Sequence, residues 1–162
     1  MALSTTPRRV NHLAPKEFKI VSMRELAADG PFVCDNPDLA ADYWRQHIAT
    51  HPFFNPDVEC LAVLLLNARR RVTGHHFVSV GLLDSTQSHP REVFRAAIIG
   101  AAAAIILMHN HPSGDPTPSD EDCTITRQLI KVGNIVKIEL LDHVIVGDDK
   151  HCSLKALGYF YK

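Results

Sequence analysis

The chain has 162 residues, of which 46% are hydrophobic and 22% charged, and these values are typical of one globular domain rather than a disordered or fibrous chain. Seventeen basic residues against eighteen acidic ones give a formal charge of −1, so the overall balance offers no electrostatic reason to expect nucleic acid or an anionic membrane as partner. The longest apolar stretch, residues 96–108 with Gly100 inside it, is too short to cross a bilayer.

Residues 1–16 are polar and contain two prolines, so nothing in them could bury one face, and we expect a flexible arm there. They also lack the apolar stretch of a secretory signal, which makes the cytoplasm the default location. The cysteines are widely spaced without a C-x-x-C pair. We expect them to be reduced thiols, mostly in or near the core: Cys34, Cys60, Cys123 and Cys152.

Residues 17–57 predict a strand and a helix that pack on the core formed by the rest of the chain. Apolar residues near Phe18 indicate the short strand. Asn36 followed by Pro37 is a typical cap for a helix that runs to about His51. The apolar side chains of this helix recur at helical spacing, so we expect it to bury one face.

Residues 58–162 predict strands that alternate with helices. The apolar run at 60–66 is typical of a strand covered on both faces, and residues 76–83 are its expected partner across a turn. Further elements are expected in this order: a helix from Pro90 to about Ala103, a strand at 104–108, a helix at 119–132 and one or two strands within 135–146. This pattern predicts an α/β or α+β domain with a central sheet covered by helices, but not the strand order.

The segment between the strand at 104–108 and the helix at 119–132 carries the chemistry. Residues two apart in an extended chain point to the same side, so His109 and His111 can present two imidazoles to one point. A loop stiffened by prolines follows, and Asp122 in the first helical turn can return a carboxylate to that point. Three such ligands leave one tetrahedral position free, which is typical of catalytic rather than structural zinc.

The same residues also allow a structural interpretation. S-x-x-D before an apolar helix is a capping pattern, with Ser119 as the cap and Asp122 favoured by the helix dipole. An isolated H-x-H is weak evidence for a metal, whereas H-x-H-x7-S-x-x-D between a buried strand and a helix is strong evidence. Both interpretations can hold together.

This string is similar to the JAMM motif of JAB/MPN metallopeptidase domains, and the letters from His109 to Gly114 with Pro118-Ser119 resemble the RadC-like branch. Residues 84–94 and 140–147 extend the resemblance, which runs from about residue 59 to residue 158. It implies a single domain of cytidine-deaminase-like architecture, in which helices flank a curved mixed sheet. It also implies one zinc ion per chain, with water as the fourth ligand beside His109, His111 and Asp122.

In this family an upstream glutamate moves protons to and from the zinc-bound water, and it is expected at the start of a strand before the histidines. Glu59 fits this position because it directly precedes the apolar run. Its rival Glu92 falls in the first turn of a predicted helix, where the helix dipole already explains a glutamate. The resemblance further implies that Ser119 steadies the tetrahedral intermediate. His143 sits among apolar neighbours and is interpreted as a core residue or one that lies behind the ligands.

The leading functional hypothesis is a zinc-dependent metallohydrolase, a metallopeptidase or isopeptidase acting on a peptide or protein through a zinc-bound water. The alternative is a zinc-containing RadC-like binding module, associated with DNA repair or mobile elements, without peptidase turnover. Its support is the resemblance and the charge run Arg69–Arg71, although such a run in a turn is more often simply solvated. Residues 1–57 do not resemble the helix-hairpin-helix unit usual in RadC-like proteins, which weakens an inference of DNA repair.

A third interpretation, an HNH nuclease, is rejected. That nuclease motif spreads its residues over a ββα-metal unit, whereas His109, Asn110 and His111 are consecutive and precede a proline-rich loop. The physiological substrate and the oligomeric state stay open at this point, and so does any contact with nucleic acid.

Overall fold

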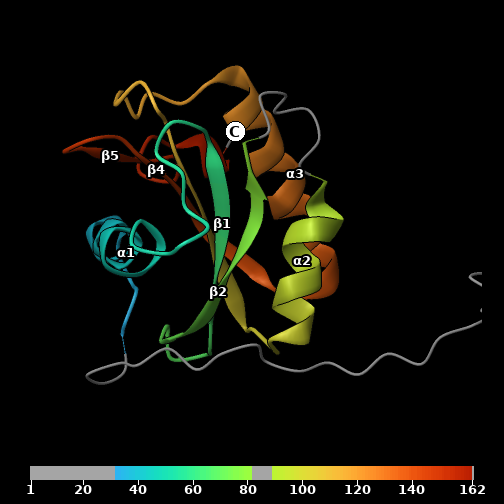
Figure 1. Ribbon diagram of the computed structural model, residues 1–162. Helices are drawn as coiled ribbons and strands as arrows, with labels where there is room; N and C mark the ends of the chain where they lie inside the picture. Colours follow the sequence, from blue (N-terminus) through green and yellow to red (C-terminus); the bar gives the residue numbers. More distant parts are fainter. Residues whose placement is uncertain (1–31, 82–88, 162) are drawn as a thin grey trace, which may run out of the picture.

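Five strands form one mixed sheet in the computed structural model, which describes residues 32–81 and 89–161 (Figure 1). Their order across the sheet is β2-β1-β3-β4-β5; β3 and β4 are parallel, and the other neighbours are antiparallel. The strands are β1 (Cys60–Leu66), β2 (Val72–Val80), β3 (Ala104–Asn110), β4 (Glu139–Val146) and β5 (His151–Ser153).

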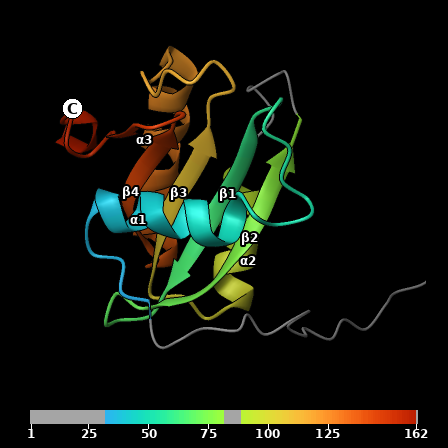
Figure 2. The ribbon, with the colours of Figure 1, turned by 60° about the vertical axis from the view of Figure 1, so that its left-hand side comes forward.

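Helices flank this sheet on both faces, which confirms the expected α+β fold class (Figures 1 and 2). The α-helices of the described ranges are α1 (Pro37–Tyr43), α2 (Pro90–Ile99) and α3 (Asp120–Val136), with a π-helical turn η1 (Trp44–Ile48) after α1 and a 3-10 turn η3 (Tyr159–Tyr161). α1 and η1 cross one face, while α2 and α3 cover the other. Asn36 caps α1 as predicted, because its side chain accepts a hydrogen bond of 2.9 Å from the backbone N–H of Leu39.

β1 is covered on both faces, as its apolar run predicted. Ala62, Leu64 and Leu66 belong to the cluster on the α1 side, whereas Val63 and Leu65 belong to the cluster on the α2 and α3 side. This alternation follows from the period of two along a strand. The centre of the sheet is therefore a packed support for the strand ends, where the candidate site lies.

α2 is shorter than predicted. It ends at Ile99 instead of Ala103, because Ala101 adopts a left-handed conformation with a φ of 48°. At Gly100 a Cβ would lie 2.6 Å from the Cδ1 of Leu65, so any other residue would require the Leu65 side chain to shift where the helix end packs on β1.

α3 is longer than predicted. It continues past Val132 to Val136 and ends where Lys137 adopts a φ of 60°. Strand β4 consequently begins at Glu139 rather than at residue 135, and the second strand of this region is β5, beyond the predicted stretch.

β2 begins at Val72 rather than at His76, because the turn after β1 is short. The side chain of Asn67 closes this turn by accepting hydrogen bonds from the backbone of Arg69 and Arg71. The arm predicted for residues 1–16 and the strand predicted near Phe18 lie outside the described residues.

All four cysteines are free thiols, as expected, and only Cys152 among them is partly exposed. In the ranges that the structure describes, no helix combines the length and the apolar character needed to cross a membrane.

Gly133 allows α3 to lie close to the start of β4. A Cβ at this position would be 2.6 Å from the carbonyl oxygen of Ile138, a backbone atom that cannot easily move aside. Gly133→Ala is therefore expected to lower the free energy of unfolding by about 1–3 kcal/mol, although alanine ordinarily favours a helix over glycine by about 1 kcal/mol. Urea unfolding measures this change.

The matched control is Gly74→Ala, since a Cβ on this β2 residue would have nothing within 4 Å. Its free energy of unfolding is expected to stay within about 0.5 kcal/mol of the parent. A Gly133→Ala protein as stable as the parent would contradict the close approach of α3 to β4.

Candidate metal centre

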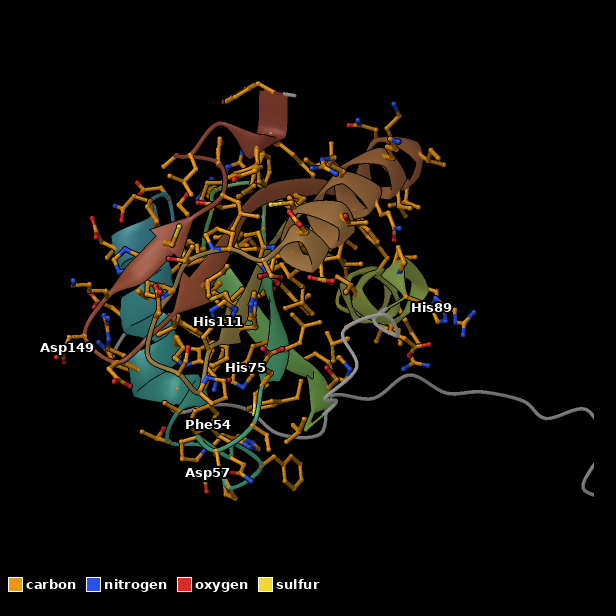
Figure 3. The ribbon with its side chains drawn as sticks, turned by 90° about the horizontal axis from the view of Figure 1, so that it is seen from above. Phe54, Asp57, His75, His89, His111 and Asp149 are labelled. Carbon is orange, nitrogen blue, oxygen red and sulfur yellow. The ribbon has the colours of Figure 1, made fainter. Side chains whose placement is uncertain are left out.

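Three predicted ligand side chains meet at one end of the sheet. β3 ends with His109 and Asn110, the loop after it carries His111, and Asp122 lies in the first turn of α3. Figure 3 views the molecule from this end and shows His111 near its middle. The strand-loop-helix order of the sequence therefore brings together the residues that the H-x-H and S-x-x-D patterns singled out.

The ligand atoms of these side chains lie at mutual distances that suit one metal ion. His109 Nε2 is 3.0 Å from His111 Nε2 and 3.2 Å from Asp122 Oδ1, and His111 Nε2 is 3.6 Å from Asp122 Oδ2. Two atoms bound to one tetrahedral zinc at its usual bond lengths are about 3.3 Å apart. Two imidazoles and a carboxylate at this spacing are a donor set that zinc accepts, so the residues fit the metal that the sequence analysis expected.

His143 of β4 lies directly behind His109. His109, Asp122 and His143 each offer a ligand atom, and these atoms lie within 4.8 Å of one another, so this largely buried His-Asp-His group could also bind a metal ion. The Nε2 of His143 is 2.9 Å from the Nδ1 of His109, on the side of that ring away from Asp122 Oδ1. Two sets of three ligands, which share His109 and Asp122, are thus available.

Burial and neighbouring charges shift the pKa values of the three histidines in different directions. Burial lowers the pKa of His109 to about 4, against a smaller opposing effect of the Asp122 carboxylate. Burial also lowers the pKa of His143 well below its usual value. By contrast, the hydrogen bond with Asp122 raises the pKa of the half-buried His111. In the metal-free protein His111 therefore binds a proton more readily than the two buried histidines, His109 and His143.

The Asp122 carboxylate is held in place by the helix cap. The backbone N–H and the hydroxyl of Ser119 both donate to Asp122 Oδ2, at 2.8 and 2.7 Å, and Ser119 Oγ accepts from the Asp122 N–H at 3.1 Å. Burial raises the pKa of Asp122, but the hydrogen bonds from His111 and Ser119 and the neighbouring His109 outweigh it and hold this pKa well below its usual range. The capping and metal-site interpretations of this segment are thus compatible in one geometry.

Glu59 precedes β1 on the strand beside the histidines. Leu61 pairs with His109 in the antiparallel register, so Glu59 lies across from His111, where its charge contributes to raising the pKa of His111. Glu92 is instead paired with two arginines of its own helix, Arg91 and Arg95. Of these two glutamates, Glu59 is therefore the one whose charge acts on the ligand cluster, the group formed by His109, His111 and Asp122.

Asn110 ties the Glu59 segment to β3, a role that the sequence analysis missed. Its Oδ1 accepts a 2.9 Å hydrogen bond from the N–H of Cys60, and its Nδ2 donates to the carbonyl of Val58 at 3.1 Å. These two partners are the residues on either side of Glu59. The sequence did contain one signal for this role. Asn110 stands between the two histidines, so its side chain points to the opposite face of the strand.

Asn110→Ala is expected to lower the free energy of unfolding by about 1–3 kcal/mol, because two backbone groups lose their partner. Hydrogen exchange at the Cys60 amide is expected to accelerate as well, since Asn110 Oδ1 protects this amide. Asn55→Ala is the control, because Asn55 is exposed and its side chain accepts a hydrogen bond from the N–H of the exposed residue Asp57. This variant should change the free energy of unfolding by about 0.5 kcal/mol or less. Unchanged exchange at Cys60 would contradict the link.

Two glycines let the loop after β3 pack on the segment after β4. At Gly147 a Cβ would be 2.1 Å from the carbonyl oxygen of Gly114, and Gly114 itself has a φ of 80°. The backbone N–H of His111 also donates to the Val146 carbonyl, at 3.0 Å. The loop that carries His111 is therefore fixed on the neighbouring strand as well as on β3.

The three consecutive arginines lie far from this centre along β1. They follow Leu66, at the end of the strand opposite to Glu59, and Arg70 pairs with Glu139 at 3.3 Å. Hence they add no basic surface beside the ligand cluster.

Comparison with known proteins points to one family. The sequence model of a family described as RadC-like JAB domain matches residues 34–159. A UPF0758 protein of Desulforamulus reducens is 51% identical over 102 residues, which are 63% of this chain and 45% of that protein. A UPF0758 protein of Staphylococcus carnosus is 47% identical over 127 residues, 77% of this chain and 53% of that protein. The chain spans about half the length of these curated relatives.

Proposed function

Because the chain belongs to the RadC-like JAB domain family, as the sequence resemblance indicated, we propose that it is a zinc-dependent metallohydrolase that cleaves peptide or isopeptide bonds. One observation carries this proposal: the Nε2 atoms of His109 and His111 and the carboxylate of Asp122 face one another at 3.0–3.6 Å. Zinc content per folded chain and the activity of a Glu59→Gln variant test it.

His109, His111 and Asp122 are the residues that would hold one zinc ion per chain. Two nitrogens and one oxygen leave one of four positions free, and an open position distinguishes catalytic from structural zinc. When bound by such a set, zinc acts as a Lewis acid and lowers the pKa of water to about 7, so that a nucleophile is available at neutral pH.

Glu59 is the residue that we assign to proton transfer. Its side chain is exposed and lies across from His111, beside the ligand cluster rather than within it. A carboxylate in this position can take a proton from the attacking water and give it to the leaving amine. The hydrogen bonds of Asn110 to both neighbours of Glu59 hold the segment at a constant distance from β3.

Ser119 is the residue that we assign to the oxyanion formed at the attacked carbonyl. Its exposed hydroxyl lies one hydrogen bond from Asp122 Oδ2, at the edge of the ligand cluster. Rotation about one side-chain bond redirects this hydroxyl, while the backbone N–H of Ser119 continues to hold Asp122 Oδ2.

A peptide or protein is a better substrate for this site than nucleic acid. Cleavage of nucleic acid requires basic groups that hold phosphates, and the arginines of the turn after β1 lie at the other end of the sheet. Two acidic groups, Glu59 and Asp122, lie at the ligand cluster, where they would repel a phosphate. This arrangement also disfavours a nucleic-acid-binding module without turnover.

A further inference from the structure

We propose that His143 and Thr126 are positioning residues, which hold His109 in the tautomer that presents its Nε2 to the metal. His143 is then not a ligand, although its nitrogen lies close enough to be considered as one. This inference rests on the metal-binding part of the proposed function. It follows from the direction of three consecutive hydrogen bonds.

The direction is set at a backbone carbonyl in α3. Thr126 Oγ1 is 2.6 Å from the carbonyl oxygen of Asp122, and a carbonyl only accepts, so the threonine hydroxyl donates its single hydrogen there. The same Oγ1 is 2.7 Å from His143 Nδ1. Since its hydrogen is already used, Thr126 must accept this second bond, and His143 therefore carries a hydrogen on Nδ1.

The next bond transmits this choice to His109. His143 has no exposed surface, and its two nitrogens are hydrogen-bonded to a neutral hydroxyl and to another imidazole rather than to a carboxylate. Burial therefore disfavours a second proton on its ring, against a smaller opposing effect of the Asp122 charge. Its Nε2 is then an acceptor, and the Nδ1 of His109 at 2.9 Å donates to it. A neutral His109 with a hydrogen on Nδ1 has its lone pair on Nε2, the atom that faces Asp122 Oδ1 at 3.2 Å.

His111 reaches the same tautomer independently. Its Nδ1 is 2.7 Å from the carbonyl oxygen of Asp115, so this nitrogen donates and the Nε2 is left for the metal. Both histidines thus direct Nε2 to one point, each through a hydrogen bond on the other ring nitrogen. Such outer hydrogen bonds are the usual means by which proteins orient metal-binding histidines.

The position of His143 argues against its acting as a ligand. Its Nε2 lies against His109 Nδ1 and its Nδ1 against Thr126, so coordination would break one of two buried hydrogen bonds. His111 Nε2 faces His109 Nε2 and Asp122, the groups that would share the ion, so a metal there would replace contacts among the ligands and leave the hydrogen bond on His111 Nδ1 intact. The same helix α3 carries Asp122 and, one turn later, Thr126, so ligand and support move together.

Thr126→Val tests the role of the hydroxyl, since valine keeps the shape of the buried side chain and removes the hydrogen bond. Zinc affinity, measured by competition with a chromophoric chelator, is expected to fall about 10–100-fold. Thr126→Ser is the matched variant, because it keeps the hydroxyl, and its affinity is expected to stay within about threefold of the parent. Circular dichroism establishes that each variant is folded before its affinity is compared.

Long-range ¹H–¹⁵N spectra of the histidine rings test the tautomers directly. We expect a hydrogen on Nδ1 of His143 with and without zinc. We expect zinc to change the ¹⁵N chemical shift of Nε2 in His109 and His111 alone. A zinc-coordinated nitrogen on His143 would overturn the proposal, as would parent-like zinc affinity in Thr126→Val. If the folded parent binds no zinc after reconstitution, the proposed function fails and this inference fails with it.

Discussion

His109→Ala and Asp122→Ala are each expected to lower zinc affinity by more than about 100-fold. Loss of a residue that only supports a ligand lowers metal affinity by about 10–100-fold, so loss of a ligand should lower it further. The parent, reconstituted with zinc and desalted, is expected to retain close to one zinc ion per chain. The reason is geometric, because His109 Nε2 and Asp122 Oδ1 are 3.2 Å apart and each supplies one of three donors. Elemental analysis of the purified, folded proteins measures this difference.

His89→Ala is the matched histidine control for this experiment. His89 is exposed and precedes α2, and its side chain makes no capping hydrogen bond, so zinc content is expected to equal that of the parent. A parent protein that retains no zinc would contradict the proposed metallohydrolase function. Full zinc content in both ligand variants would show that the ion binds elsewhere.

Glu59→Gln is expected to reduce hydrolysis by about 10²–10⁴-fold, the usual contribution of general acid–base catalysis. Zinc content is expected to stay at the parent level, because the Glu59 carboxylate is no part of the three-ligand set. Glutamine keeps the size of the side chain but cannot accept and return a proton at neutral pH. The assay uses a fluorogenic library that contains both α-peptide and lysine isopeptide bonds.

Glu92→Gln is the control for removal of an acidic group. Glu92 forms ion pairs with Arg91 and Arg95 on the exposed surface of α2, so activity is expected to remain at the parent level. Parent-like activity in Glu59→Gln would remove this residue from the mechanism. A zinc-loaded parent that cleaves no member of the library would favour the binding module over the peptidase.

The ligand segment could be predicted from the sequence because its geometry is local. Two histidines separated by one residue share a side of an extended chain, and a cap pattern places Asp122 in the first turn of the next helix. Strand β1 could also be predicted from the sequence, since a continuous apolar run is typical of a strand covered on both faces. The choice of Glu59, by contrast, needed the resemblance to a family.

His143 was expected in the core or behind the ligands, but the contacts of the supporting residues could not be predicted, because they depend on how distant strands align. His143 reaches His109 only through the parallel register of β3 and β4, which pairs Leu107 with His143. Asn110 reaches the Glu59 segment across the β1–β3 pairing. The ends of α2 and α3 were misplaced for a similar reason, since left-handed residues such as Lys137 end them where packing on the sheet requires it.

The local origin of the ligands has a consequence for the order in which the site assembles. His109, His111 and Asp122 come from one strand-loop-helix segment, whereas the contact from Asn110 to Cys60 spans 50 positions. Closing a loop of ~50 residues rather than ~13 costs roughly 1 kcal/mol more in chain entropy. The three ligands can therefore meet early in folding, before β1 docks beside β3. The residues that we propose to hold the metal and the residue that we propose to move protons are thus expected to be placed at different stages of folding, joined by the side chain of Asn110.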